Sequence, residues 1–237
     1  MISRHRPVRF QNRHDAGEQL AARLDHAHLH APVVLALPRG GVPVGYEIAL
    51  ALDAPLDVFV ARKVGAPGRR ELGIGAIAEG GVVVADAEML RTLGVSSARF
   101  DQLADAERAE LSRRVRLYRG ERALPDLADH DVVLADDGLA TGITAEAALR
   151  SLRGRGARRL LLAVPAAAPE SAARLTGLAD EVVCVIAPID FVAVGKWYDD
   201  FDQTSDEEVL RLLAAADQPR TAAAKRSNSP GMSGPDG

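Results

Sequence analysis

Short apolar runs alternate with segments of helical periodicity along most of the chain. A continuous apolar run bounded by proline or glycine predicts a strand that is covered on both faces. Such runs predict strands over 33–37, 56–61, 131–135, 159–164 and 181–186. Apolar residues at helical spacing predict helices over 15–24, 42–52, 145–152, 169–175 and 206–215. This alternation is typical of βαβ units, so we expect an α/β fold with a central, mostly parallel sheet flanked by helices.

The region between residues 62 and 119 has a different pattern. Residues 65–70 are rich in turn formers and basic side chains, and we expect them to be mobile. The apolar stretches 74–78 and 82–85 flank Glu79-Gly80-Gly81, which predicts a β-hairpin. Residues 96–118 form a long, highly charged helical pattern with a modest apolar stripe. We therefore expect a hairpin or loop beside the main sheet.

Composition limits the class of protein and its extent. The chain has 237 residues, of which 47% are hydrophobic, which suits one large domain. The formal net charge of -4 does not favour a nucleic-acid partner. No apolar run is long enough to span a membrane and no secretory signal is present, so we expect a cytoplasmic protein. From residue 216 onward the composition predicts a disordered tail (216–237) after a domain over 1–215.

The most informative segment follows the predicted strand over 131–135. The strand leads directly into the adjacent carboxylates of Asp136 and Asp137, and a short loop then leads into a helix. In open α/β sheets, ligands bind outside the carboxyl ends of the strands. The loop consists of Gly138, Leu139, Ala140, Thr141, Gly142, Ile143 and Thr144. Its glycines allow a ligand to approach the backbone, and its hydroxyls and free helix-terminal amides suit a phosphate.

The paired aspartates need a different ligand from the loop, because carboxylates repel phosphate. Vicinal hydroxyls of a ribose, or a magnesium ion that coordinates them, would meet this need. We therefore predict that the segment binds a ribose 5-phosphate, with Asp136 and Asp137 as ligands of Mg²⁺, partly through substrate and water.

Other interpretations of the same residues are weaker. Paired aspartates can be solvated at a strand end, and a Gly-Thr pair can cap a helix. Phosphatases of the haloacid-dehalogenase type have two aspartates separated by one residue, whereas here the two are adjacent. A P-loop would need a terminal Gly-Lys-Ser/Thr, which the segment lacks.

The segment 132–144 resembles the diphosphate-sugar signature of type I phosphoribosyltransferases, in which an acidic pair leads into a Thr-Gly-x-Thr phosphate loop. Further segments resemble a loosely characterised bacterial branch of this superfamily. They are Phe10-Gln11-Asn12-Arg13, Leu37-Pro38-Arg39-Gly40-Gly41, residues 62–67 and Trp197-Tyr198-Asp199-Asp200-Phe201. The resemblance covers most of the chain up to about residue 215.

The resemblance implies roles for residues outside the phosphate loop. A pyrophosphate would be bound by Arg39, Gly40, Gly41, Arg62 and Lys63, and the catalytic set would be Asp136, Asp137, Arg39 and Lys63. The segment 65–81 would close over the reaction. A small hood, formed from the N-terminal segment and residues 187–203, would hold the base against Phe191, Trp197 or Tyr198. A homodimer is usual in such families.

The implied reaction is the Mg²⁺-dependent transfer of a 5-phosphoribosyl group from 5-phosphoribosyl-1-pyrophosphate (PRPP) to a nitrogenous acceptor, with release of pyrophosphate. We expect the acceptor to be a nucleobase. Two residues depart from common patterns. Gly138 stands where many members have an aliphatic residue, but this change removes no polar group. Ala140 stands where 6-oxopurine enzymes carry an aspartate, which argues against a hypoxanthine-guanine enzyme of the usual form.

Two other functions remain open on the sequence alone. A regulatory protein could bind PRPP on the same fold without turnover, although the chain shows no added DNA-binding module. A phosphate-ester hydrolase could use a similar sheet, although neither Gly-x-Ser-x-Gly nor a Cys-His pairing is evident.

Overall fold

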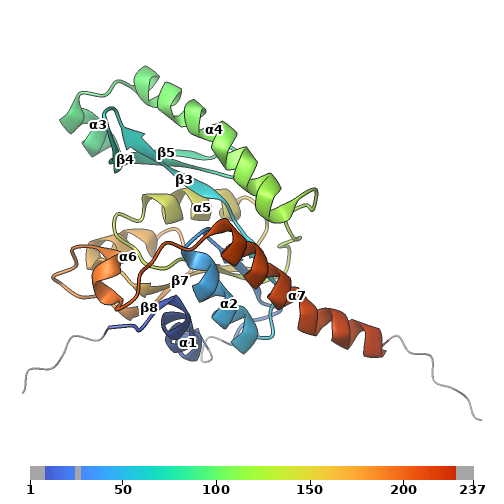
Figure 1. The fold of residues 1–237 in the computed structure, drawn as a ribbon. Helices are drawn as coiled ribbons and strands as arrows, with labels where there is room; N and C mark the ends of the chain where they lie inside the picture. Colours follow the sequence, from blue (N-terminus) through green and yellow to red (C-terminus); the bar gives the residue numbers. More distant parts are fainter. Residues whose placement is uncertain (1–8, 25–27, 228–237) are drawn as a thin grey trace, which may run out of the picture.

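The main sheet contains five parallel strands in the order β2-β1-β6-β7-β8 (Figure 1). This computed structural model describes residues 9–24 and 28–227. The strands are β1 (Val33–Ala36), β2 (Leu56–Val58), β6 (Asp131–Ala135), β7 (Arg159–Ala166) and β8 (Glu181–Ile186). The flanking helices are α1 (Arg13–Leu24), α2 (Gly41–Ala51), α5 (Ile143–Arg153), α6 (Pro169–Leu175) and α7 (Asp206–Ser227). The predicted α/β fold with a parallel, helix-flanked sheet is confirmed.

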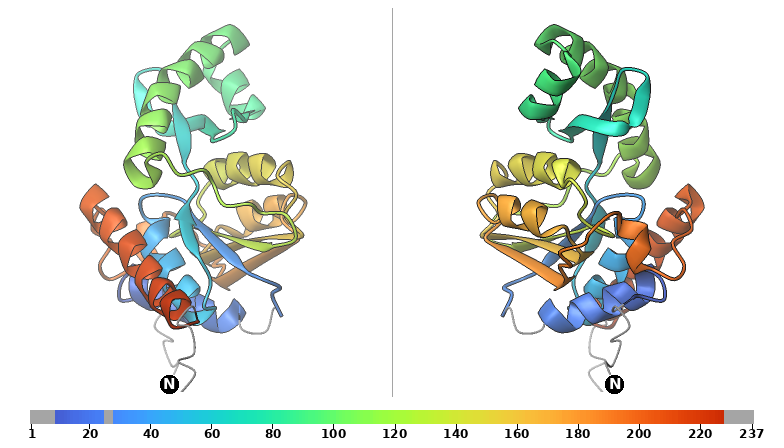
Figure 2. Two further views of the ribbon diagram at one scale, coloured as in Figure 1. Left: turned by 90° about the vertical axis from the view of Figure 1, so that its right-hand side faces the viewer. Right: turned by 90° about the vertical axis from the view of Figure 1, so that its left-hand side faces the viewer.

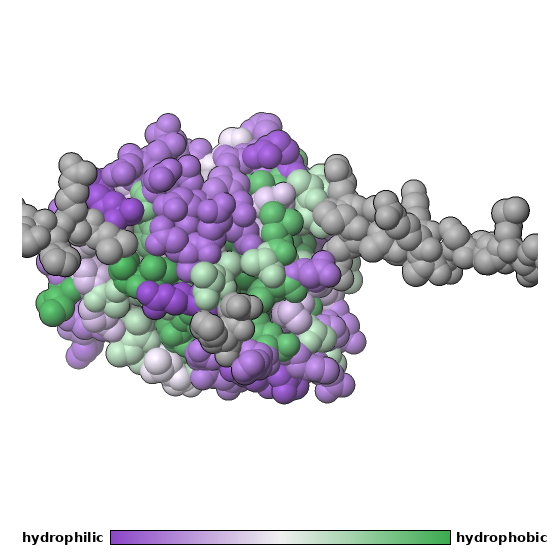
Figure 3. All heavy atoms as spheres, turned by 90° about the horizontal axis from the view of Figure 1, so that it is seen from below, coloured by the Kyte–Doolittle hydropathy of each residue, from purple (hydrophilic) through white to green (hydrophobic). Residues whose placement is uncertain are grey.

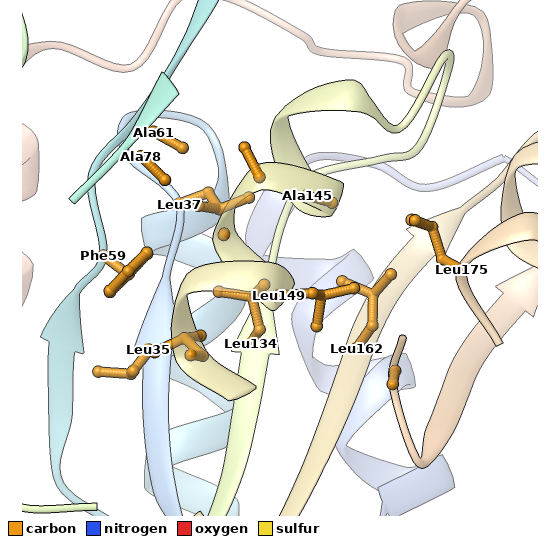
Figure 4. Packing of buried hydrophobic residues seen from close by; sticks show 14 of the residues in the cluster. Leu35, Leu37, Phe59, Ala61, Ala78, Leu134, Ala145, Leu149, Leu162 and Leu175 are labelled. Atoms are coloured by element: carbon orange, nitrogen blue, oxygen red, sulfur yellow. The ribbon is translucent and has the colours of Figure 1, made fainter. Parts of the chain in front are cut away.

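Both faces of the sheet are buried, which explains the continuous apolar runs. Alternate residues of a strand point to opposite faces. Leu35 and Leu134 therefore pack with Leu149 of α5 in one core (Figure 4), while Val34 and Val133 belong to the core that lies against the other helices. Helices α1, α2 and α7 cover this second face.

A smaller lobe stands beyond α5 (Figures 1 and 2). It contains the antiparallel strands β3 (Ala61–Ala66), β4 (Arg69–Ala78) and β5 (Val83–Ala85), with the helices α3 (Ala87–Leu93) and α4 (Ser97–Arg119). The hairpin predicted over 74–85 is present as β4 and β5, and Pro67 and Gly68 within the segment 65–70 form the β3–β4 turn. Its own core includes Val64, Ile74 and Phe100.

The strand predicted over 56–61 is wrong beyond Val58. The chain leaves the main sheet there, because the amide of Val60 donates to Oε1 of Glu79 at 2.6 Å instead of pairing with β1. Arg119 at the end of α4 is 5% exposed and donates to both carboxylate oxygens of Glu79 and to the carbonyl oxygen of Val58. This buried network anchors the small lobe to the edge of the main sheet.

Other boundaries also differ from the prediction. Strand β7 continues through Pro165 to Ala166, and α7 continues past residue 215 to Ser227. Residues 228–237 lie outside the described part, so the division at residue 215 stays a prediction. Within the described residues, no helix combines the length and apolar character that crossing a bilayer requires. On the face seen from below in Figure 1, hydrophilic and hydrophobic residues are interspersed (Figure 3).

Candidate active site

The predicted site lies where β1 and β6 end, side by side, at one edge of the sheet. These strands pair in parallel register from Val33 with Val132 to Ala36 with Ala135, so the loops that follow them meet. A Cβ on Gly40 would lie 2.6 Å from Cγ of Asp137, and one on Gly41 would lie 2.7 Å from the carbonyl oxygen of Ala135. Any larger residue would separate the two loops. The structure therefore brings Arg39, Gly40 and Gly41 into the same region as the acidic pair.

The side chain and the backbone of Asp137 are each held by a group from a distant part of the chain. Nε of Arg13 donates to Oδ2 of Asp137 at 2.8 Å, and the hydroxyl of Tyr198 donates to the carbonyl oxygen of Asp137 at 2.6 Å. Arg13 also donates to the carbonyl oxygen of Asp202 at 2.7 Å, and its guanidinium lies 3.9 Å from the ring centroid of Phe201. Arg13 is a functional candidate that the sequence reasoning did not assign to the site.

Burial changes the acidity of both aspartates. It raises the pKa of Asp136 well above the usual range, and repulsion from Asp137 adds to this shift. Burial also raises the pKa of Asp137, while the charge of Arg13 and its hydrogen bond act in the opposite direction. A bound cation would favour the charged form of both groups.

The donor set fits a magnesium ion that substrate and water would complete. Oδ1 of Asp136 accepts from the amide of Asp137 at 2.9 Å, and Oδ2 of Asp137 accepts from Arg13. Oδ2 of Asp136 accepts no hydrogen bond from the described part of the chain. No cluster of three or more His, Cys, Asp or Glu residues suited to a metal occurs among those residues. Hard oxygen ligands of this kind suit Mg²⁺, which usually retains several waters.

In the phosphate loop, most backbone carbonyl groups have hydrogen-bond partners within the described chain and most backbone amides do not. The carbonyl oxygens of residues 139–142 each accept a hydrogen bond, from the amide of Ala168, Oγ of Ser171, the guanidinium of Arg174 and the amide of Glu146, respectively. In contrast, the amides of residues 140–145 donate to no other group in the part of the chain that the structure describes. Because the carbonyls are held elsewhere, the loop presents a row of free N–H donors at the start of α5, which is the arrangement that binds phosphate.

A cavity of about 470 Å³ opens over this loop. Its lining includes Asp136, Asp137, Thr141 and Thr144, together with Lys63 from β3. Helix α5 begins after Gly142, which has a φ of +68° that glycine adopts readily. The cavity therefore joins the acidic pair, the phosphate loop and one of the predicted cations.

Gly138 packs against Val194, a contact that the sequence did not predict. A Cβ on Gly138 would lie 2.8 Å from Cγ2 of Val194 and still closer to Cγ1. Val194 begins the short 3-10 helix η2 (Val194–Trp197) and lines the same cavity. The departure at this position is therefore compensated in space, because Val194 fills the volume that an aliphatic residue at 138 would need.

Not every predicted cation faces the cavity. Arg62 donates through Nε to Glu107 of α4 at 2.7 Å and does not line this cavity. Nη1 of Arg39 lies 3.5 Å from Oδ1 of Asp206. The hydroxyl of Tyr118 donates to the same oxygen at 2.5 Å. Burial and that hydrogen bond raise the pKa of Tyr118 to about 12. Only Lys63 of the predicted basic set lines the cavity.

The three predicted base-binding aromatics do not line the cavity either. Trp197 is 9% exposed and Tyr198 is 1% exposed, and both pack with Phe10 in a small core. The N-terminal segment and residues 187–203 are in contact, because the amide of Phe10 donates to the carbonyl oxygen of Trp197 at 2.8 Å, but the hood itself stays a prediction. Phe191 stacks on Trp197 with centroids 6.3 Å apart and is partly exposed. Residues 1–8 of the predicted hood lie outside the described part.

The chain belongs to the phosphoribosyl transferase domain family, whose model matches residues 9–201. It is 46% identical over 207 residues to proteins from two strains of Mycobacterium tuberculosis, CDC 1551 / Oshkosh and H37Rv. These are named "Putative phosphoribosyl transferase MT0597" and "Putative phosphoribosyl transferase Rv0571c". The match covers 87% of this chain but 47% of each relative, so the chain spans about half the length of the curated relatives it matches.

One solved structure is similar to this protein over nearly the whole length of the solved chain. The crystal structure of TT1426 from Thermus thermophilus superimposes with a TM-score of 0.73 at 44% sequence identity. The match covers 87% of this chain and 98% of that one. The sheet and its covering helices are therefore shared with this protein.

Proposed function

We propose that the protein is a phosphoribosyltransferase that binds PRPP with Mg²⁺ and transfers its 5-phosphoribosyl group to a nitrogenous acceptor, releasing pyrophosphate. The observation that carries this proposal is the phosphate loop, in which all carbonyls from 139 to 142 are held while the amides from 140 to 145 are free. Next to these donors, the pair Asp136-Asp137 offers oxygens to the ribose hydroxyls and to a metal. Family membership supports the same reaction class.

Each side chain has a distinct task in the proposed reaction. The 5-phosphate would accept hydrogen bonds from the loop amides and from the hydroxyls of Thr141 and Thr144. A bound Mg²⁺ would neutralise charge on the pyrophosphate. Lys63 lines the cavity and would assist the leaving group, because a charge-assisted hydrogen bond to a departing oxygen is stronger than a neutral one. Arg13 keeps Asp137 in place and is a positioning residue.

The bond changes need no covalent enzyme intermediate. The lone pair of the acceptor nitrogen forms a bond to the anomeric carbon as the bond from this carbon to the pyrophosphate oxygen breaks. The pyrophosphate leaves with the electron pair, and the acceptor nitrogen loses its proton to solvent. The protein orients the partners and stabilises the charge that develops on the leaving group.

Titration of the protein with PRPP and MgCl₂ by calorimetry tests the proposal. We expect magnesium-dependent binding that Asp136→Asn with Asp137→Asn weakens at least ~100-fold, since both the metal and the hydroxyls lose anionic partners. The control is Asp53→Asn with Asp101→Asn, which removes the same charge at two exposed positions. Unchanged affinity in the Asp136/Asp137 variant would contradict the site.

Turnover separates an enzyme from a protein that only senses PRPP. Pyrophosphate release that requires an acceptor supports the transferase. Tight binding without release under any acceptor supports the regulatory alternative, and release of phosphate without an acceptor supports a hydrolase.

A further inference from the structure

The peptide between Asp137 and Gly138 is held at its carbonyl group and free at its amide. The hydroxyl of Tyr198 donates to the carbonyl oxygen of Asp137 at 2.6 Å. This peptide is trans, and a trans peptide directs its C=O and its N–H to opposite sides, so the amide of Gly138 points away from Tyr198. That amide donates to no group within residues 9–24 and 28–227. Tyr198 therefore holds one side of the peptide and leaves the other side available to a ligand.

The free amide of Gly138 lies at the cavity over the phosphate loop. Gly138 lines this cavity together with Asp136 and Asp137, whereas Tyr198 does not line it. Since the C=O of the peptide is directed at Tyr198, its N–H is the group that can face the cavity. The amide is separate from the row of donors at 140–145, because the intervening amide of Leu139 donates to the carbonyl oxygen of Ala166 at 2.8 Å. Gly138 thus offers one isolated donor beside the acidic pair.

The ring of Tyr198 is firmly packed. Tyr198 is 1% exposed, and its ring centroid lies 5.3 Å from that of Phe10 and 4.8 Å from that of Phe201. Its carbonyl oxygen accepts from Nη2 of Arg9 at 2.6 Å. A buried ring cannot stack on a base, because stacking needs an exposed ring face. What Tyr198 provides to the site is therefore its hydroxyl group.

The groups beside the amide of Gly138 suit a sugar hydroxyl. A hydroxyl group both donates and accepts, whereas an ionised carboxylate only accepts and an amide N–H only donates. One ribose hydroxyl can therefore donate to a carboxylate of the acidic pair and accept from Gly138 at the same time. A phosphate oxygen would be repelled by the two carboxylates, so it fits the separate row of amides better.

We infer that Tyr198 is a positioning residue, which acts through the carbonyl group of Asp137 to direct the amide of Gly138 at a hydroxyl of the bound ribose. This inference rests on the proposed function and adds to it a contact with the sugar that neither the phosphate loop nor the metal supplies. It also gives Tyr198 a role in binding PRPP in place of stacking the base.

Tyr198→Phe tests the inference, because it removes the hydroxyl and keeps the ring. Displacement of PRPP in MgCl₂, followed by calorimetry, would compare ribose 5-phosphate with tetrahydrofurfuryl phosphate, which keeps the ring and the phosphate but lacks the ring hydroxyls. We expect the variant to bind ribose 5-phosphate about 5-fold to 10-fold more weakly, since a hydrogen bond to the sugar is impaired. Its affinity for tetrahydrofurfuryl phosphate should stay within about 2-fold of the original.

The matched control is Tyr46→Phe on α2. It makes the same chemical change, and the hydroxyl of Tyr46 forms no hydrogen bond in the part of the chain that the structure describes. This variant should bind both ligands as the original protein does. If Tyr198 only supported the fold, its loss would weaken both ligands alike, so the ratio of the two dissociation constants separates positioning from a general loosening of the site.

NMR of the original protein labelled with ¹⁵N-glycine gives a second readout that needs no variant. The amide proton of Gly138 should move downfield when ribose 5-phosphate binds, because it gains an acceptor. Tetrahydrofurfuryl phosphate should move it much less. This measurement decides the question even if Tyr198→Phe does not fold.

Three results would overturn the inference. The first is a Tyr198→Phe variant that binds ribose 5-phosphate as well as the original protein does, or that loses affinity for both ligands equally. The second is a Gly138 amide signal that responds to the two ligands alike. The third is a protein from which ribose 5-phosphate does not displace PRPP. Absence of PRPP binding to the original protein would instead contradict the proposed function itself.

Discussion

The loops after β1 and β6 leave neighbouring strands at the same edge of the sheet and both lead into helices, yet they use glycine differently. In the first loop, Gly40 and Gly41 are needed for packing, because Asp137 and Ala135 occupy the space of their side chains. The amide of Gly41 donates back to Leu37 at 3.0 Å, so this loop is internally bonded there. In the second loop, the amides from 140 to 145 are free of partners among the described residues. The first loop supports the acidic pair by packing against it, and the second has N–H donors that are free for a ligand.

Among changes that leave the acidic pair intact, the largest expected loss of PRPP affinity comes from disturbing the supporting loop. Gly40→Ala places a methyl group against the Asp137 carboxylate, so the carboxylate must move. Overpacking of this kind costs about 1–3 kcal/mol, and we expect PRPP affinity in calorimetry to fall about 10-fold to 100-fold. The control is Gly177→Ala, because nothing lies within 4 Å of a Cβ at that position. Affinity as high as that of the control would show that the two loops do not depend on each other.

A smaller effect should follow when the carbonyls of the second loop are released. Ser171→Ala and Arg174→Gln remove the donors to the carbonyl oxygens of Ala140 and Thr141, which could then turn towards the phosphate. Each lost hydrogen bond is worth about 1 kcal/mol, so PRPP affinity should fall about 5-fold to 10-fold.

Two comparisons make this second prediction specific. Affinity for inorganic pyrophosphate, measured in the same way, should stay unchanged, because this ligand has no 5-phosphate. Glu170→Gln, at an exposed position of the same helix, should behave as the original protein. Equal losses for PRPP and pyrophosphate would mean that α6 stabilises the whole site and not the loop.

The remaining prediction concerns stability and not affinity, and it tests the pairing of Gly138 with Val194. Gly138→Ala should destabilise the protein by about 1–3 kcal/mol, because its methyl group meets the side chain of Val194. Val194→Ala removes both γ carbons, so the double variant should recover part of this loss. Denaturant unfolding of both single variants and the double variant measures the coupling. Strict additivity would show that the two residues do not compete for the same space.

Much of the main sheet could be predicted, because local pattern and burial agree there. The strand over 131–135, the helix over 169–175 and the strand over 181–186 have the predicted bounds. Prediction failed between Val58 and Ala61, where the apolar run is continuous but the chain changes sheets. The hydrogen bond from Val60 to Glu79 joins residues 19 positions apart, and periodicity carries no sign of it.

In the candidate site, too, some residues could be predicted from the sequence and others could not. The acidic pair and the phosphate loop were found together because they are contiguous, and their order after a strand is informative. Arg13 lies 124 positions from Asp137 and was not assigned to the site, since no local signal marks an arginine as a partner of a distant carboxylate. The base-binding prediction for Trp197 and Tyr198 remains without support, because aromatic residues pack in cores as readily as they line sites.

The sequence by itself determined the parallel α/β architecture and the position of the candidate phosphate loop, since both depend on local order and on the alternation of buried residues. Only the tertiary structure decided which charged side chains lie near that loop and which are held elsewhere. It turned Arg62 towards Glu107, tied Arg39 to Asp206 and placed Arg13 on Asp137. The physical reason is that a charged side chain is directed by partners that folding brings near it, and these partners lie far away along the chain.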